Sequence, residues 1–251
     1  MTAPAVDLDG SIDDRLAAVR ARLAAACDAT GRPRPAVRLL LASKTMPAER
    51  VREALVADAR ARALDPTLVP VLLGENRVQE LVEKAPALAD LAPDWHVIGP
   101  LQSNKVNAAL RWAGTVESVA TLDLARRLSE RSRDRPAPLA VHVQVNVSGE
   151  ASKHGVHPHD AHGLALAVAA LPGLRLTGFM TVGANSPDDT VVRAGYALLR
   201  TLRDEVLASG APGTASAVEL SMGMSRDLEA AVAEGATVVR IGSAVFGART
   251  R

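Results

Sequence analysis

Lys44 is the residue in this sequence whose position most strongly suggests chemistry. It follows a run of mostly apolar residues, 37–43, and precedes a helix that is predicted to begin at Pro47. In α/β barrels of this length, the carboxyl ends of the strands carry the functional residues. A lysine desolvated there can lose its proton and attack an aldehyde. The alternative is an ordinary lysine whose stem lies along the strand end while its ammonium reaches solvent.

Two segments near the end of the chain could hold an anion. Residues 220–225, Leu-Ser-Met-Gly-Met-Ser, and residues 239–244, Val-Arg-Ile-Gly-Ser-Ala, end the last two predicted strands. Barrels of this class commonly bind phosphate at that place with backbone N–H groups and a helix N-terminus. Ser225 and Ser243 can donate hydroxyl hydrogen bonds, and Gly242 lets the backbone approach a ligand closely. Two ordinary turns of small residues are the alternative.

Arg240 has the spacing that points a side chain inward from the last predicted strand. Together with Lys44 and the two serine-bearing turns, it supplies an aldehyde-capturing amine, a phosphate site and a cation near a ring. Pyridoxal 5′-phosphate (PLP) is the ligand that needs all three. An arginine facing the pyridine nitrogen would keep that nitrogen unprotonated, so the ring would be a poor electron sink.

Polar residues also follow or occupy the second and third predicted strands. Residues 74–80, Gly-Glu-Asn-Arg-Val-Gln-Glu, could orient a ring or an oxyanion, or could be a turn and a solvated helix start. His96 could act as a general base. We favour the interpretation of His96 as a strand histidine that is hydrogen-bonded within the core.

The fifth predicted strand carries His142, Gln144 and Asn146 on one face. In a barrel this face is either the lumen or the outer shell, and several polar side chains on it are unusual for a buried parallel strand. Four further histidines lie in a loop that leads into a helix: His154, His157, His159 and His162. No acid or cysteine pattern accompanies them, so we favour solvated histidines over a metal site.

The elements that must position these residues alternate between β and α. The predicted strands are 37–42, 69–73, 95–98, 115–119, 140–147, 174–180, 218–221 and 237–241. The predicted helices are 48–64, 77–84, 103–111, 121–133, 159–170, 188–209 and 226–235. This alternation predicts parallel strands with right-handed crossovers, and eight such units close into a (β/α)8 TIM barrel. An open doubly wound sheet is the alternative, but no strand is followed by Gly-x-Gly-x-x-Gly.

Local signals define several helix ends. An N-terminal helix over 11–27 is predicted to be capped by Ser11, and the last helix is predicted to be capped by Ser225 and to end at Gly235. The second helix is predicted to be extended and to end in a turn at Asp65.

Composition narrows the class of protein. The chain has 251 residues, of which 48% are hydrophobic and 2% aromatic, so a large aliphatic core is available and base stacking is not. The formal charge of +1 argues against a broad nucleic-acid surface. Cys27 is the only cysteine, which excludes an internal disulfide and a cysteine zinc site.

These features predict one PLP-binding barrel domain over residues 1–251, with residues 1–10 flexible. The first ten residues carry acids and no apolar core, so they are not a signal peptide. No stretch approaches eighteen uncharged apolar residues, so no membrane span is expected. We expect a cytoplasmic protein and, since no dimer-building second domain is evident, a monomer.

Five blocks of the sequence together resemble the pyridoxal phosphate homeostasis protein family. They are residues 41–45, 74–80, 95–105, 220–225 and 239–249, in the family's order. The resemblance implies a barrel like the N-terminal domain of alanine racemase, the PLP fold type III. It also implies a protein that binds PLP without established turnover. Such a protein would pass this vitamin B6 cofactor to PLP-accepting apoenzymes and keep amino-acid pools in balance.

The resemblance implies roles for six residues. Lys44 matches the Schiff-base lysine, Asn76 matches the asparagine near the ring, and Arg240 matches the arginine at the pyridine nitrogen. The other three match phosphate contacts: Ser225, Gly242 and Ser243. Family members commonly have threonine where Ser243 stands, and serine keeps the hydroxyl. The segment 57–70 is longer than usual, so the register of the second strand and the placement of Asn76 depend on how it folds.

Two enzyme functions compete with a non-catalytic carrier. An amino-acid racemase on the same barrel needs a second acid–base group on the opposite face of the ring, which in alanine racemase is a tyrosine. The only tyrosine here, Tyr196, is predicted to lie in the helix after the sixth strand. A Schiff-base aldolase would use Lys44 without a cofactor, but it does not explain Arg240 or the turn at Gly242 and Ser243.

Overall fold

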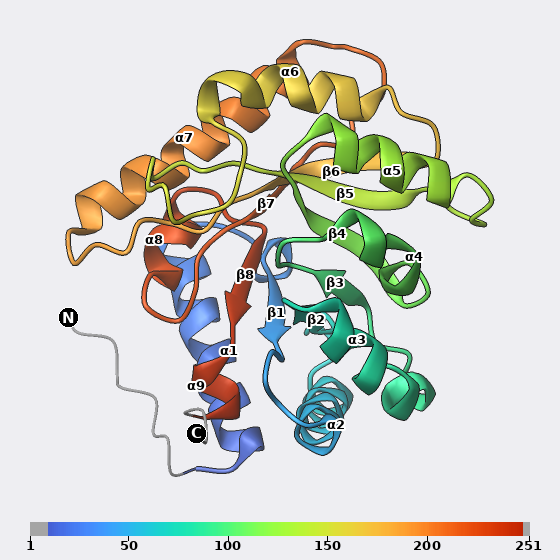
Figure 1. Cartoon of the computed structure of the whole chain (residues 1–251). Coiled ribbons are helices and arrows are strands. Elements are labelled where there is room, and N and C mark those ends of the chain that lie inside the picture. The colour runs from blue at the N-terminus through green and yellow to red at the C-terminus, as the bar shows by residue number, and fades with distance from the viewer. Residues whose placement is uncertain (1–9, 248–251) are drawn as a thin grey trace.

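The strands form a closed parallel barrel with helices around it (Figure 1). The structure is a computed structural model and describes residues 10–247. Of the segment predicted to be flexible, residues 1–9 lie outside the described residues. Each strand pairs with its neighbour in chain order, and β8 closes on β1. The predicted (β/α)8 barrel is confirmed, and the open sheet is wrong.

Eight strands are present within residues 10–247: β1 Arg38–Ala42, β2 Leu72–Glu75, β3 Trp95–Val97, β4 Ala113–Val119, β5 Leu139–Gln144, β6 Leu174–Met180, β7 Glu219–Ser221 and β8 Val238–Ile241. The helices of this region are α1 Ile12–Ala29, α2 Ala48–Leu64, α3 Val78–Lys84, α4 Val106–Ala109, α5 Leu122–Ser132, α6 Pro158–Ala169, α7 Asp189–Ala208, α8 Leu228–Ala233 and α9 Ser243–Phe246. Short 3₁₀ helices lie at Arg34–Ala36, Pro86–Leu91 and Ser103–Lys105.

Helix α1 is additional to the eight strand–helix units. Ser11 caps it as predicted, because its Oγ accepts a hydrogen bond from Asp14 N at 3.2 Å and Asp14 Oδ2 accepts the Ser11 N–H at 3.1 Å. The apolar side of α1, including Leu16, Val19 and Leu23, is buried. The helix packs against α2, α8 and α9, so it covers the side of the barrel where the last strand meets the first.

The second strand differs from its prediction. It runs over Leu72–Glu75 rather than 69–73. Pro70 lies inside the predicted range, and proline has no N–H to give to a sheet ladder, so the strand starts beyond it. The prediction for the longer segment is confirmed: α2 continues to Leu64, and Leu68 N donates to Asp65 O at 3.1 Å in the turn that follows.

Three further predictions about element ends are wrong. The helix predicted over 103–111 is split into a 3₁₀ turn and the short α4. Strand β5 ends at Gln144, and Asn146 lies beyond it, where its N–H donates to Val156 O at 2.9 Å. Ser225 does not cap the helix predicted over 226–235, because α8 begins at Leu228 with Asp227 at the N-cap position. The chain leaves the helix through Gly235, which has a φ of +100° as its predicted role requires.

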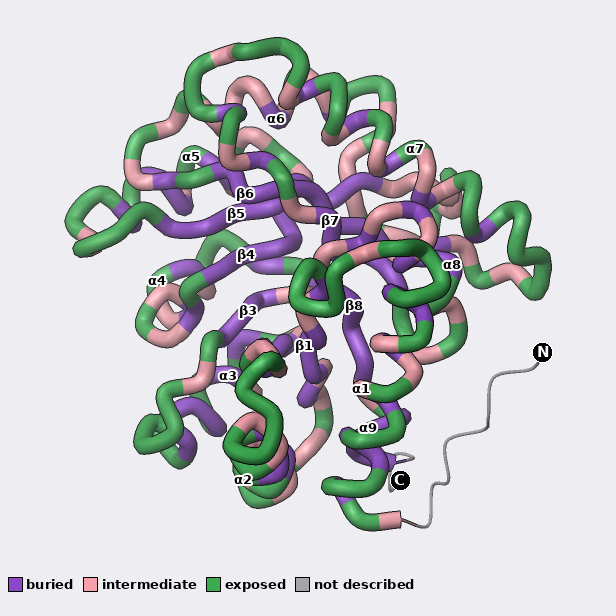
Figure 2. Tube along the Cα trace, turned by 180° about the vertical axis from the view of Figure 1, so that it is seen from behind, coloured by how far each residue is buried: buried purple, intermediate pink, exposed green. Residues whose placement is uncertain are grey.

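The apolar core fills the layer between the strands and the helices, and Figure 2 shows the strands buried and the outer sides of the helices exposed. Alternation along β1 places Leu39 and Leu41 in this layer and Leu40 in the lumen, where Leu40 contacts Leu72 and Val238. Close helix-on-strand packing suits the aliphatic composition. Within residues 10–247, no helix has the length and apolarity that crossing a bilayer requires.

Candidate functional site

Lys44 is the second residue after β1, at the carboxyl end of the barrel, and it is half-buried. The residue before it, Ser43, is fully buried and donates its hydroxyl to Glu75 Oε1 at 2.7 Å. Lys84 of α3 donates from Nζ to Ser43 O at 2.9 Å and to Glu75 Oε1 at 2.7 Å. Burial raises the pKa of Glu75 above its ordinary value, although the bonds from Lys84 and Ser43 oppose this. The bonds of Ser43 to Glu75 and Lys84 therefore fix the backbone directly before Lys44.

Thr45, the residue after Lys44, has an unusual backbone conformation. Its φ is +65°, which a β-branched residue adopts only when its surroundings impose it. Glu80 provides that constraint, because its Oε2 accepts the Thr45 N–H at 2.6 Å. Lys44 thus stands between two residues whose conformations are held by α3 and β2, and this fixes the direction in which its stem leaves the chain.

Asn76 is half-buried and follows β2 directly, at the same end of the barrel as Lys44. The exit of β3 packs closely against it: a Cβ on Gly99 would lie 2.3 Å from Asn76 O. A residue larger than glycine at position 99 would displace the Asn76 backbone. The later start of β2 therefore does not move Asn76 away from the strand ends.

Arg240 lies in β8 and is buried, with its side chain inside the barrel. Its Nη1 donates to Ser221 Oγ at 2.9 Å, and its Nη2 donates to Thr181 O at 2.6 Å. The predicted inward direction of Arg240 is confirmed by these bonds. A guanidinium carries five N–H donors, so donors remain beyond the two that these bonds use.

Gly242 brings the end of β8 close to the end of β1. A Cβ at this position would lie 3.2 Å from Ala42 O and 3.6 Å from Ala42 Cβ. Ser243 follows as the exposed first residue of α9. The close approach places the turn at Gly242 and Ser243 beside the strand that leads to Lys44.

The loop that carries Ser225 connects β7 to α8. Gly223 has a φ of +89°, and a Cβ there would lie 2.3 Å from Ala231 Cβ, so the tight turn admits only glycine without rearrangement. Asp227 Oδ1 accepts the Met224 N–H at 2.6 Å. The half-buried Ser225 is therefore presented by a loop with a defined shape.

Helix α1 also holds this loop. Arg22 donates from Nη1 to Ser225 O at 2.6 Å, and its Nε and Nη2 each lie 2.5 Å from one oxygen of Glu229. Hydrogen bonding to Glu229 raises the pKa of Arg22. The additional helix thus contributes a bidentate arginine that fixes the Ser225 carbonyl.

Tyr196 lies in α7 as predicted and is fully buried. Its hydroxyl donates to Asp227 Oδ2 at 2.8 Å, and Asp227 in turn accepts from Met224 N. Burial and the neighbouring Asp227 carboxylate raise the pKa of Tyr196. This tyrosine therefore supports the β7–α8 loop.

The six predicted site residues come together at one end of the barrel. They follow or occupy β7, β8, β1 and β2, which are four consecutive neighbours. An amine, an amide, a guanidinium and a turn with a hydroxyl and a glycine thus lie at the same end of neighbouring strands. This donor set matches the aldehyde, the ring and the phosphate of PLP.

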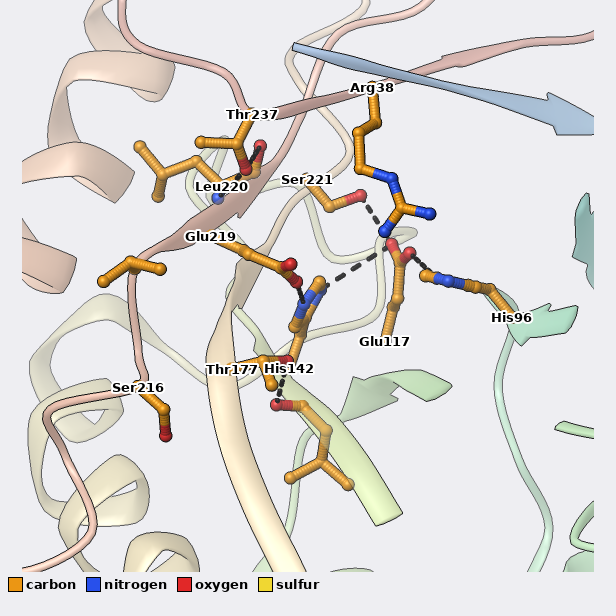
Figure 3. Close-up of polar contacts among 12 residues, drawn as sticks. Arg38, His96, Glu117, His142, Thr177, Ser216, Glu219, Leu220, Ser221 and Thr237 are labelled. Atoms are coloured by element: carbon orange, nitrogen blue, oxygen red, sulfur yellow. Dashed lines mark hydrogen bonds and ion pairs between the residues drawn. The ribbon is translucent and has the colours of Figure 1, made fainter. Parts of the chain in front are cut away.

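Inside the barrel, Glu117 is surrounded by polar side chains (Figure 3). Glu117 of β4 is fully buried and lies 2.6 Å from His96 Nδ1, and its Oε2 accepts the Ser221 hydroxyl at 2.5 Å. His142 Nδ1 lies 3.9 Å from Glu117 Oε2, and His142 Nε2 lies 2.7 Å from Glu219 Oε2. Glu117 is a single acid in an apolar run and gave no signal in local patterns.

The ionisable groups in this layer shift one another's pKa values. Burial disfavours charged His96, but its contacts with Asp94 and Glu117 outweigh burial and raise the pKa of His96 to about 9. Burial likewise disfavours charged Glu117, but the bond from His96 and the charges of His142 and Arg240 lower the pKa of Glu117 to about 2. The interpretation of His96 as a strand histidine that is hydrogen-bonded within the core is confirmed. Of the two faces left open for His142, the structure shows the lumen.

The histidines of the β5–α6 region do not converge. His157 caps α6 by accepting the His159 N–H at 3.2 Å, and His159 lies 3.1 Å from Asp160. In the part of the chain that the structure describes, no group of three or more His, Cys, Asp or Glu side chains could hold a metal ion.

Known proteins share both the sequence and the fold. Residues 17–250 match the family model described as the alanine racemase N-terminal domain. The pyridoxal phosphate homeostasis protein of Pseudomonas aeruginosa is 45% identical over 239 residues, which cover 95% of this chain and 96% of that protein. The homeostasis protein of Escherichia coli K12 is 38% identical over 242 residues, covering 95% and 97%.

Solved structures agree with these matches. PipY of Synechococcus elongatus, in its structure with PLP bound, superposes with a TM-score of 0.77 at 31% identity, covering 94% of this chain and 100% of that one. Alanine racemase of Corynebacterium glutamicum superposes with a TM-score of 0.65 at 18% identity, covering 97% of this chain and 62% of the racemase. The racemase shares the barrel fold.

Proposed function

The chain belongs to the pyridoxal phosphate homeostasis protein family, and from this membership we propose that it holds PLP as a Schiff base on Lys44 without catalytic turnover. Its role is then to store the vitamin B6 cofactor, to limit free aldehyde and to support amino-acid balance. Relatives that cover nearly the whole chain carry the homeostasis name, and PipY has been solved with PLP bound.

The observation that carries this proposal is the meeting of the six residues at the ends of four neighbouring strands. Lys44 supplies the amine, and its neighbours Ser43 and Thr45 are held in place by α3 and β2. Arg240 supplies a buried cation at the strand ends. The phosphate contacts come from Ser225 and from the turn that follows β8.

PLP supplies an aldehyde for the amine and a phosphate dianion for the two loops. The residues of this chain bind and orient it. Arg240 is a guanidinium that stays protonated, so it can donate a hydrogen bond to the pyridine nitrogen but cannot give it a proton. That pairing weakens electron withdrawal by the ring, in keeping with a protein that carries the cofactor rather than one that uses it.

The finer features of this role are also proposals. We propose that the protein acts in the cytoplasm as a monomer and passes PLP to apoenzymes. Its recognition of those apoenzymes would involve the strand-end face that carries Lys44, because the cofactor must leave through it.

A racemase is the second candidate, and the shared barrel with alanine racemase motivates it. Against it, Tyr196 is fully buried and its hydroxyl is bonded to Asp227. We expect the purified protein with PLP to leave the α-hydrogen of alanine unexchanged in deuterated buffer. Exchange at enzyme-like rates, followed by proton NMR, would favour the racemase.

The test of the carrier proposal compares Lys44→Ala with wild-type protein. We expect Lys44→Ala to lose the visible absorption band of the bound cofactor and its fixation by borohydride, while phosphate-driven affinity remains. Lys105→Ala is the matched control, since it removes a lysine that follows β3 on the same barrel. An unchanged spectrum in Lys44→Ala would show that the cofactor is attached elsewhere.

A further inference from the structure

The barrel lumen contains a charged layer where such barrels usually have branched aliphatic side chains. Leu40, Leu72 and Val238 form the usual aliphatic contact on one side of the lumen. On the other side, Glu117 of β4 and Ser221 of β7 are bonded to each other. Strands β4 and β7 are not neighbours, so this bond crosses the interior.

Arg240 is a buried cation that is hydrogen-bonded to this charged layer. It is 5% exposed, and among residues 10–247 no carboxylate oxygen lies within the 4.0 Å of an ion pair with its guanidinium. A buried cation needs an anion or several acceptors to offset its lost hydration. The acceptors of its side chain are Ser221 Oγ and Thr181 O, and Ser221 passes directly to Glu117.

The hydrogen bonds that link Arg240, Ser221 and Glu117 run in one direction. An arginine only donates, so Ser221 Oγ accepts from Arg240 Nη1. The one hydroxyl hydrogen of Ser221 is then free to be donated to Glu117 Oε2. Glu117 is also the acceptor for His96 and faces His142. The anion nearest to Arg240 along these bonds is therefore Glu117, and Ser221 is the bridge.

We propose that Glu117 and Ser221 are positioning residues for the cofactor ring, because they set the orientation and the charge balance of Arg240. The inference rests on the proposed function, since it gives Arg240 the ring as its ligand. In this proposal Glu117 and Ser221 act through Arg240 and not by contact with the ring. Burying polar side chains in the lumen costs free energy. The need to balance the buried cation of Arg240 explains why this layer is polar.

The test measures binding of 4′-deoxypyridoxine 5′-phosphate, which has the ring and the phosphate but no aldehyde, so Lys44 chemistry does not contribute. Titrations monitored by ligand fluorescence or calorimetry compare wild type, Glu117→Gln, Ser221→Ala and Thr177→Val. The last variant is the matched control. Thr177 is a buried hydroxyl residue of β6 whose Oγ1 donates to Val141 O and not to Glu117, Ser221 or Arg240.

We expect Glu117→Gln and Ser221→Ala each to weaken binding about tenfold, as loss of a hydrogen bond that involves a charged group does. Thr177→Val stays within about twofold of wild type. In an Arg240→Gln background, the same two substitutions should lose their effect, because residues that act through one another are not additive. Ser221→Ala removes only one oxygen, so it carries the test if Glu117→Gln fails to fold in a thermal melt.

The outcomes separate this inference from the proposed function. If wild-type protein does not bind the analogue, the proposed function fails. If wild type binds it and both variants bind equally well, only the inference is overturned. Equal losses with and without Arg240 would also overturn it, since they would show a purely structural role for Glu117 and Ser221.

Discussion

The buried pair of Glu75 and Lys84 gives a quantitative test of how the backbone around Lys44 is held. Lys84→Met removes the ammonium that lies 2.7 Å from Glu75 Oε1 and 2.9 Å from Ser43 O, and it keeps a side chain of similar length. Glu75 is 1% exposed, so its carboxylate is left in the core without this cation. Removing one partner of a buried pair costs about 3–5 kcal/mol.

Protonation of Glu75 limits this cost and makes it depend on pH. The ordinary pKa of the carboxyl group is 4.5, and burial raises it in the folded protein. Lys84→Met removes the Lys84 bond and charge that oppose this rise, so the pKa of Glu75 is raised further in the variant than in wild type. Because the folded variant binds a proton that the unfolded chain releases, its stability falls as the pH rises above 4.5.

Urea unfolding at pH 5, 6 and 7 measures this difference in the free energy of unfolding between Lys84→Met and wild type. We expect the loss to grow as the pH rises over this range, by at most about 1.4 kcal/mol per pH unit. The double variant with Glu75→Gln has no carboxyl group to titrate, so its loss should be constant. A loss in Lys84→Met that is the same at all three pH values would refute the assignment of Glu75 as the stranded charge.

Three further outcomes are expected. Arg22→Ala should weaken PLP binding about tenfold in an equilibrium titration, because the Ser225 carbonyl loses a charged donor. Arg22→Lys should recover part of the lost affinity. Tyr196→Phe should lower the free energy of unfolding by about 1–2 kcal/mol in urea, because it leaves Asp227 short of one donor. The raised pKa of His96 predicts a contribution to stability that is complete below pH 6.5 and lost as the pH rises through about 9. Unfolding curves at pH 6, 8 and 9.5 test this against His96→Gln, whose stability should lack that decline.

Much of the fold follows from local patterns. Alternating runs of β-rich and helical sequence identified each strand of the barrel, since every unit repeats the same change from period two to period 3.6. The strand-end positions of Lys44 and of the turn at Gly242 then followed from topology, because parallel strands end on one side. The inward direction of Arg240 needed only alternation along β8.

The features that were missed depend on contacts between distant parts of the chain. The bond between Glu117 and Ser221 joins residues 104 positions apart, and no local pattern contains it. Serine is a common N-cap residue, but Asp227 and not Ser225 occupies the N-cap position of α8. Arg22 binds the Ser225 carbonyl instead. Hydrophobic periodicity likewise does not weigh a single proline, which is why the start of β2 was placed too early.

The most direct measurement of the central claim is peptide mass mapping of wild-type protein that has been loaded with PLP, reduced with borohydride and digested. The structure presents the amine of Lys44 between two fixed residues at the strand ends, so the added mass of reduced cofactor is expected on the peptide that contains Lys44. Its appearance on a peptide with a different lysine, or a protein that gains no mass at all, would contradict the account.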